Sequence, residues 1–217
     1  MDAVRVSALR ERLTGTGWLE AVGGFAGELR RAVSRRGAGE LLLVGTEAYE
    51  PWHLAAHLKD EAAWSDVPRL APTLLRHRVP AQAPGHLAHG LGRLTEAGRG
   101  ATVLVVAPAA AGETLLERVH DARRHGATVL ALDGAGPDAP DGPSAAGPAD
   151  LTGLADLTGL AHRRLAVGTG EEEPFDLAQH LVSAAAGQRP ARRSAAALER
   201  LAALAARLTA GPTVSRW

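Results

Sequence analysis

The sequence has no cysteine among its 217 residues. Disulfide bonds, thiolate chemistry and cysteine-based zinc sites are therefore excluded. Aromatic residues are also scarce, at 3%, although hydrophobic residues make up 46% of the chain. A sizeable core is therefore expected, built mostly from leucine, valine and alanine, in one large domain or a domain with appendages.

The sequence also lacks an excess of charge of either sign, because 24 basic side chains balance 24 acidic ones. Proteins that bind a nucleic-acid backbone usually carry a basic excess or a basic stripe. A nucleic acid is therefore not expected as the main partner. Lys59 is the single lysine, whereas arginine and alanine abound, a bias typical of a high-GC bacterial genome.

No apolar run approaches the roughly 20 residues that a membrane-spanning helix needs. The N-terminal stretch MDAVRVSALRERL is charged and has no apolar core of the kind found in signal peptides. We therefore expect a cytoplasmic protein without a membrane partner.

Apolar residues alternate between helical and strand patterns along the chain. Helices are predicted over residues 1–38, 51–65, 86–97, 113–125, 175–188 and around 197–208, and strands over 40–46, 102–107, 127–133 and 163–168, with a short edge strand at 77–79. The Gly/Pro/Ala-rich segment 134–148 is predicted to be a loop. The hexapeptide ADLTGL then occurs twice, over 149–160, which indicates a local duplication.

Strands that alternate with helices predict an α/β fold, a three-layer sandwich with a mainly parallel central sheet and additional N- and C-terminal helices. One domain is predicted over residues 1–188, including the N-terminal helical segment 1–38, followed by a linker and C-terminal helix over 189–217. Ligands of such folds bind beyond the carboxyl ends of the strands. The loops expected to hold a ligand are 46–52, 107–113 and 133–150.

The stretch VLVVAPAAAGETLLERVHDARRHGATVLALD, residues 103–133, has the pattern of strand, small-residue loop, helix and strand. It resembles the second half of the sugar isomerase (SIS) domain, in which a Ser-Asn-Ser-Gly-Glu-Thr-like loop follows a strand. Gly112, Glu113 and Thr114 match the Gly-Glu-Thr of that loop. Upstream, ELLLVGT…HLAAHL is similar to the family's first strand, glycine turn and helix. Downstream, HRRLAVG…FDLAQHL is similar to its last strand and closing helix, so the likeness covers roughly residues 18–188.

The resemblance implies a carbohydrate derivative, a sugar phosphate, as the ligand, with no cofactor. It also implies a homodimer or higher homo-oligomer, because relatives generally build their sites between subunits. A loop that enters a helix offers free N–H groups and the positive end of the helix dipole, which suit a phosphate. The implied ligand-binding residues are Gly45, Thr46, Ala109, Ala110, Ala111, Gly112, Glu113 and Thr114.

The chain departs from the family at both loops. Ala109, Ala110 and Ala111 stand where the family has Ser-Asn-Ser, so the side-chain donors are missing. Each lost hydrogen bond to a charged group is worth about 1.5–3 kcal/mol. In the first loop, Glu47 and Glu50 would repel a phosphate unless an arginine or a metal intervenes. These changes favour a non-catalytic protein that binds or senses a sugar derivative, or an interaction module.

A working sugar-phosphate isomerase is the alternative within the same family. Such a reaction needs a base that moves a proton between neighbouring carbons and an acid–base group at the oxygens. Glu50 and Glu61 are candidate bases, with Glu113 a further one, and His180 is the candidate histidine, although a buried or interface role for His180 is also open.

A metal-dependent enzyme is the second alternative. His53, His57 and Glu61 are spaced i, i+4 and i+8, so they lie near one face of a helix and could bind a metal. The same spacing also arises by chance in a chain with nine histidines, on a polar or dimer-facing helix side. Leu54 follows His53, so the HExxH pattern of zinc hydrolases is missing.

Two tryptophans, Trp52 and Trp64, flank the helix that carries these histidines. They are expected to pack or to form an interface. An exposed Trp52 beside the loop 46–52 would instead indicate a platform on which a sugar could stack.

Overall fold

The computed structural model describes residues 17–134, 157–167 and 175–188. Its centre is a five-stranded sheet in which all neighbouring strands are parallel, in the order β2-β1-β3-β4-β5. The strands are β1 (Leu41–Val44), β2 (Pro72–Leu75), β3 (Thr102–Ala107), β4 (Thr128–Gly134) and β5 (Arg163–Val167).

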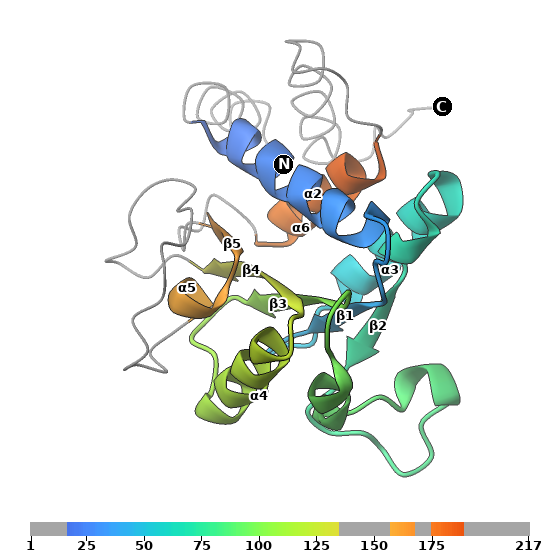
Figure 1. Ribbon diagram of the computed structural model, residues 1–217, viewed down its shortest axis with the longest axis vertical. Coiled ribbons are helices and arrows are strands. Elements are labelled where there is room, and N and C mark those ends of the chain that lie inside the picture. Colours follow the sequence, from blue (N-terminus) through green and yellow to red (C-terminus); the bar gives the residue numbers. More distant parts are fainter. Residues whose placement is uncertain (1–16, 135–156, 168–174, 189–217) are drawn as a thin grey trace, which may run out of the picture.

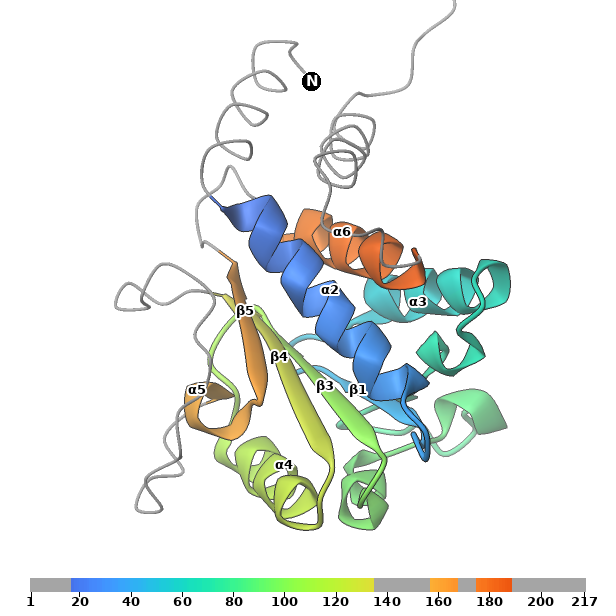
Figure 2. The same cartoon turned by 45° about the horizontal axis from the view of Figure 1, so that its top comes forward.

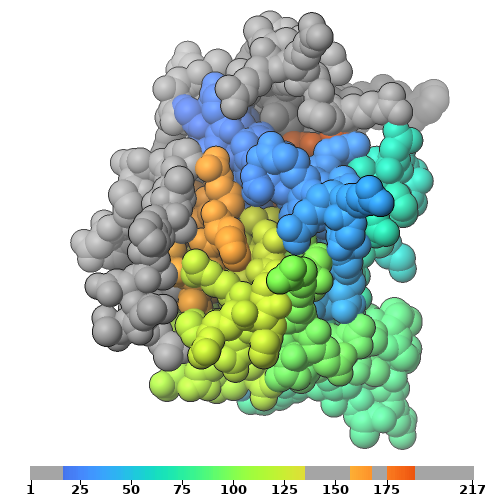
Figure 3. All heavy atoms as spheres, viewed as in Figure 1, coloured from blue at the N-terminus to red at the C-terminus, as the bar shows by residue number. Residues whose placement is uncertain are grey.

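Helices cover both faces of this sheet, so the protein is a three-layer α/β sandwich (Figure 1). The helices are α2 (Trp18–Ser34), α3 (Trp52–Trp64), α4 (Glu113–Arg124), α5 (Leu157–Leu160) and α6 (Phe175–Gly187), with 3₁₀ turns η1 (Pro68–Leu70), η2 (Gly85–Leu87) and η3 (Leu91–Glu96). α2, α3 and α6 pack together on one face, as Figure 2 shows, and α4, α5 and η3 lie on the other. In the space-filling view, α2 and α4 lie on opposite sides of β5 (Figure 3).

The strands are apolar without alternation because both faces of the sheet are covered. In β1, Leu41 and Leu43 belong to the core under α2, α3 and α6, whereas Leu42 and Val44 belong to the core under α4, α5 and η3. Every residue of β1 and β3 is buried. The continuous apolar runs of the sequence are therefore explained by two cores that share one sheet.

The strand order determines where a ligand can reach the sheet. The chain passes from β1 through α3 to β2 on one side of β1, and from β3 through α4 to β4 on the other side. Consequently α3 and α4 start from neighbouring strands but lie on opposite faces. The switch point between the carboxyl ends of β1 and β3 is where ligands bind in folds with this strand order.

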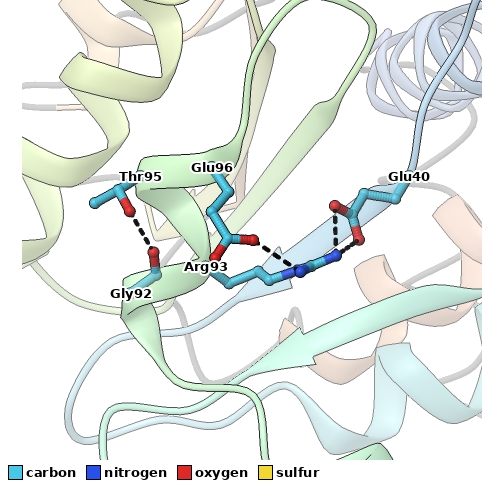
Figure 4. A network of polar contacts seen from close by, with 5 residues as sticks. All are labelled: Glu40, Gly92, Arg93, Thr95 and Glu96. Carbon is cyan, nitrogen blue, oxygen red and sulfur yellow. Dashed lines mark hydrogen bonds and ion pairs between the residues drawn. The ribbon is translucent and has the colours of Figure 1, made fainter.

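The opposite, amino-terminal edge is held by a surface network of charges (Figure 4). Arg93 of η3 donates hydrogen bonds to Glu40, which precedes β1, and to Glu96 in its own turn. The hydrogen bond and the charge of Glu40 raise the pKa of the Arg93 guanidinium. This network attaches η3 to the edge of the sheet opposite the two loops at the carboxyl edge.

Two predicted elements were wrong. The edge strand is Pro72–Leu75 rather than 77–79, because the apolar residues of 72–75 can pair with β1, whereas His77 lies beyond the strand end and bonds to Gly45. The helix predicted over 86–97 is replaced by η2 and η3, since Gly90 between them has an extended backbone that a helix does not allow.

The other predicted elements within the described residues are confirmed to within a few residues at their ends. The last four residues of the second ADLTGL copy form α5. Four predicted segments lie almost entirely outside the described residues: 1–16, the loop 134–148, the first ADLTGL copy at 149–154, and 189–217. None of the described helices is long and apolar enough to cross a membrane.

Candidate functional site

Two loops flank the switch point at the carboxyl edge of the sheet. Residues 45–51, here called the β1-loop, connect β1 to α3, and residues 108–112, the β3-loop, connect β3 to α4. All eight residues that the sequence predicted to bind a ligand lie in these loops or in the first turn of α4. The fold therefore places the two predicted loops on adjacent strands.

The β1-loop is closed by its own backbone. A Cβ atom at Gly45 would overlap the carbonyl oxygen of Tyr49 and lie 2.7 Å from Cδ of Pro51. Thr46 is buried, and its carbonyl accepts a hydrogen bond from the Tyr49 N–H at 3.1 Å. Nε2 of His77 lies 3.0 Å from the carbonyl oxygen of Gly45. Glycine is thus required at position 45 by close packing.

Arginines that follow β2 pair with both acidic residues of the β1-loop. Nε of Arg76 lies 3.1 Å from both carboxylate oxygens of Glu50, in a largely buried ion pair. Arg78 donates to Glu47 at 2.7 Å on the surface. An arginine or a metal was expected to offset these carboxylates, but no sequence pattern singled out Arg76 and Arg78. The charged RHR segment after a strand was the signal that could have done so.

Trp52 begins α3 beside the β1-loop and is 41% exposed. The guanidinium of Arg76 lies over its ring, with Cζ at 5.1 Å from the ring centroid. An exposed indole beside this loop meets the expectation for a platform on which a sugar could stack.

The β1-loop is also attached to α6. Gln179 donates a hydrogen bond of 2.8 Å to the Tyr49 hydroxyl, and Phe175 contacts the Tyr49 ring edge-on, with centroids 6.0 Å apart. Burial raises the pKa of the Tyr49 hydroxyl. These two contacts attach the β1-loop to the first two turns of α6.

The β3-loop, by contrast, is open to solvent. Ala109, Ala110 and Gly112 are exposed, and so are Glu113 and Thr114 in the first turn of α4. Gly112 is the N-cap and supplies no side-chain cap. No residue of the described ranges accepts a hydrogen bond from the backbone N–H groups of positions 112–114. Free N–H groups and the positive end of the helix dipole therefore point into solvent.

Three histidines come together between α3 and α6. His53 and His57 lie one turn apart on α3, and His180 reaches them from α6. The ring centroids are 4.6 Å apart for His53–His57, 4.2 Å for His53–His180 and 3.9 Å for His57–His180. One ring nitrogen from each lies within 4.8 Å of the others. Spacing along the sequence suggested His53 and His57 as metal ligands and His180 as a separate catalytic residue, and only the fold brings the three together.

Two of the three histidines have lowered pKa values. Burial, reinforced by the neighbouring His57 and His53, lowers the pKa of His180 to about 4. Burial also lowers the pKa of His57, and the charge of His53 adds to this effect. Asp60 and Asp176 are the acidic residues that act in the opposite direction.

The three carboxylates considered as catalytic bases have different surroundings. Glu50 pairs with Arg76, and Glu113 lies exposed in the first turn of α4. Glu61 lies against Gly187 at the C-terminal end of α6, where a Cβ atom would overlap its carboxylate. Burial raises the pKa of Glu61. His180 contacts His53 and His57, so its described ring contacts are with histidines rather than with a carboxylate.

No family model and no curated protein matches this sequence. Among solved structures, the fold is similar to the crystal structure of a candidate sugar binding protein from Salmonella typhimurium LT2, with a TM-score of 0.51 and 17% sequence identity. The match covers 92% of this chain and 52% of that chain, so this chain spans about half the length of that structure. At this identity the likeness concerns the fold, and membership of the SIS family stays a prediction.

Proposed function

We propose that the protein binds a carbohydrate derivative, a sugar phosphate, at the β1/β3 switch point, as a SIS-like binding or sensing protein without isomerase activity. The observation that carries the proposal is the open first turn of α4. Its N–H groups at positions 112–114 are exposed and have no acceptor among the described residues. A phosphate supplies acceptors for such groups and is favoured by the helix dipole.

The strand order and the surroundings of the loop support this position. The turn belongs to one of the two loops at the switch point, where ligands of such sheets bind. Its Gly112-Glu113-Thr114 sequence matches the phosphate loop of the family that the chain resembles. The structurally similar Salmonella protein is described as a candidate sugar binding protein. The indole of Trp52 would offer an apolar surface to the sugar ring.

Because the β3-loop contains alanines, a phosphate would be bound there mainly by backbone N–H groups. Without serine hydroxyls, the side-chain donors to a phosphate are reduced to Thr114. We therefore expect an affinity in the high micromolar to millimolar range, because each missing charged hydrogen bond costs about 1.5–3 kcal/mol. Binding of this strength suits a sensor of an abundant metabolite.

Isomerase activity is not part of the proposal. A base and a histidine must reach one substrate, whereas Glu50 pairs with Arg76, Glu61 lies against Gly187, and His180 contacts two other histidines. An isomerase assay with hexose and pentose phosphates, followed by NMR, is expected to show no interconversion. Turnover that is abolished by Glu50→Gln would overturn the non-catalytic assignment.

Binding is tested by thermal shift and by chemical-shift perturbation, with hexose, pentose and amino-sugar phosphates at millimolar concentrations. Inorganic phosphate and the unphosphorylated sugars are tested alongside, so that the contributions of the phosphate group and of the sugar ring to binding can be measured separately. We expect shifts at Gly112, Glu113 and Thr114 with the sugar phosphates. If none of these compounds shifts those signals, the sugar-phosphate proposal fails and a role as an interaction module is left.

A matched pair of substitutions at one exposed position controls the binding experiment. Ala110→Asp places a negative charge beside the open turn and is expected to abolish binding, whereas Ala110→Ser adds a donor and is expected to keep it. Both side chains fit because Ala110 is exposed. Equal affinities for the two variants would show that the ligand binds elsewhere.

We also propose a homo-oligomer. Trp64, at the end of α3, is 81% exposed and would be covered in an assembly. Light scattering of the full chain at micromolar concentration is expected to give at least a dimer, and Trp64→Arg is expected to weaken it. A monomer in both cases would contradict this proposal.

A further inference from the structure

The partly buried histidine cluster of α3 and α6 plays no part in the proposed sugar-phosphate site. Three imidazoles from two helices converge, with ring centroids between 3.9 and 4.6 Å apart. Two turns of α3 and one turn of α6 therefore bring three potential nitrogen ligands together.

We propose that His53, His57 and His180 form a binding site for a divalent transition-metal ion, with one nitrogen ligand from each residue. One ring nitrogen of each histidine lies within 4.8 Å of the others. Nitrogen ligands of a tetrahedral zinc ion at about 2.1 Å are separated by about 3.4 Å. A side-chain adjustment of about 1 Å is therefore sufficient to bring the three nitrogens to one ion.

The helices explain why these three residues can act together. His53 and His57 are four residues apart, so their side chains lie one above the other on α3. α3 and α6 both begin at the carboxyl edge of the sheet, after β1 and β5 respectively, and therefore run in the same direction. This places the second turn of α6, with His180, beside the first two turns of α3.

The rings are also free to bind. No residue of the described ranges forms a hydrogen bond to a ring nitrogen of His53, His57 or His180, although the structure records such bonds for His77 and His162. Each ring is partly accessible, so an ion can enter from solvent.

The ligand set is different from the one predicted by spacing alone. Glu61 follows His57 by one helical turn, but its carboxylate lies against Gly187, and the group of potential ligands consists of the three histidines. Three imidazoles suit zinc, nickel, cobalt or copper rather than calcium or magnesium. A three-histidine set leaves a fourth position for water or another small ligand.

The experiment uses the full chain, free of any histidine tag and treated with a chelator before dialysis. Titration with zinc chloride in a calorimeter is expected to show one ion per chain and a rise in melting temperature, because the ion links α3 to α6 only in the folded state. Cobalt supplies a second measurement, since the intensity of its visible absorption distinguishes four-coordinate from six-coordinate ions.

Single substitutions identify the ligands. His180→Ala removes the only ligand from α6 and is expected to weaken zinc binding at least tenfold and to abolish the rise in melting temperature. His57→Ala is expected to do the same. His86→Ala, at an exposed histidine outside the cluster, serves as the matched control and is expected to bind like the wild type. Glu61→Gln is also expected to bind like the wild type.

Three results would overturn the proposal. These are a stoichiometry below about 0.1 ion per chain, unchanged affinity in His180→Ala, and equal losses in His180→Ala and His86→Ala. His180→Asn, which keeps the size of a polar side chain, replaces the alanine variant if circular dichroism shows that the latter is unfolded. Magnesium chloride is the negative control, because it is expected to produce no binding heat.

Discussion

The two loops at the switch point end neighbouring strands of one sheet, yet they are built in opposite ways. The β1-loop uses its own polar groups: the Gly45 carbonyl bonds to His77, the Glu50 carboxylate bonds to Arg76, and Tyr49 bonds to α6. The β3-loop exposes alanine side chains and leaves backbone N–H groups without acceptors among the described residues.

This contrast indicates different roles for the two loops. The first supports the carboxyl edge through its own contacts, and the second is the loop at which we propose that a ligand binds. Substitutions in the β1-loop should therefore change the free energy of unfolding. Substitutions in the β3-loop should change ligand affinity while stability stays nearly constant.

The largest effect is expected for Gly45→Ala. The added methyl group would overlap the Tyr49 carbonyl oxygen, and neither that backbone nor Pro51 can easily move. We expect a loss of about 3 kcal/mol in the free energy of unfolding, measured by urea denaturation.

Gly112→Ala is the matched control in the β3-loop. Its φ is −71°, and no atom lies within 4 Å of the added Cβ. We expect a change of less than about 1 kcal/mol, because the conformation is open to any residue. Equal losses for the two variants would remove the contrast between the loops.

The next effect concerns affinity. Ala109→Ser combined with Ala111→Ser restores hydroxyl groups to the β3-loop, and one new hydrogen bond to phosphate is expected to tighten sugar-phosphate binding about tenfold. Isothermal titration calorimetry measures the change. Ala88→Ser, at an exposed alanine in another segment, should leave the affinity unaltered. An equal gain in affinity for Ala88→Ser would show that the tighter binding does not come from the β3-loop.

A smaller effect is expected when the ion pair of the β1-loop is broken. Arg76→Met removes the partner of Glu50 and should lower the free energy of unfolding by about 1 kcal/mol, because the pair is largely but not fully buried. A double-mutant cycle with Glu50→Gln isolates the interaction. Arg78→Met breaks an exposed pair with Glu47 and should cost close to nothing. A reversed order of these two losses would contradict the packing described for this loop.

The smallest effect is a pH dependence of the same loop. The folded protein raises the pKa of Tyr49 above its ordinary value of 10.0, mainly through burial, so the neutral hydroxyl is favoured in the folded state. The neutral Tyr49 hydroxyl therefore contributes its full share of the free energy of unfolding below about pH 10. This contribution is lost as the pH rises through the pKa of Tyr49 in the folded protein. Tyr49→Phe should lose less stability than the wild type over this alkaline range, as measured by thermal denaturation. Identical alkaline slopes would show that Tyr49 does not contribute.

The segment from β3 through α4 to β4 could be predicted almost residue by residue. Its strands are continuous apolar runs, and Leu115, Leu116 and Val119 repeat with the helical period, while Gly126 ends the helix with a positive φ. Such signals are local, since they depend on neighbours within a few residues. The strand β2 was placed a few residues too late, because its pairing with β1 is a long-range choice that no local pattern records.

The sequence predicted where the loops of the candidate site lie, but not which distant side chains contact them or one another. Spacing along one helix suggested His53 and His57, and resemblance to a family suggested the β3-loop. His180 lies 123 positions after His57, and Arg76 lies 26 positions after Glu50, so only the packing of α3 against α6 and of β2 against β1 brings these pairs together.

The sequence by itself determined the α/β class, the parallel character of the sheet and the positions of the two loops, because hydrophobic period and strand–helix alternation act over short distances. Only the tertiary structure decided that one loop is closed and the other open. It also decided that Glu50 is paired with an arginine and that three histidines meet between two helices. These outcomes depend on side chains far apart in the chain, whose contacts exist only once both faces of the sheet are covered.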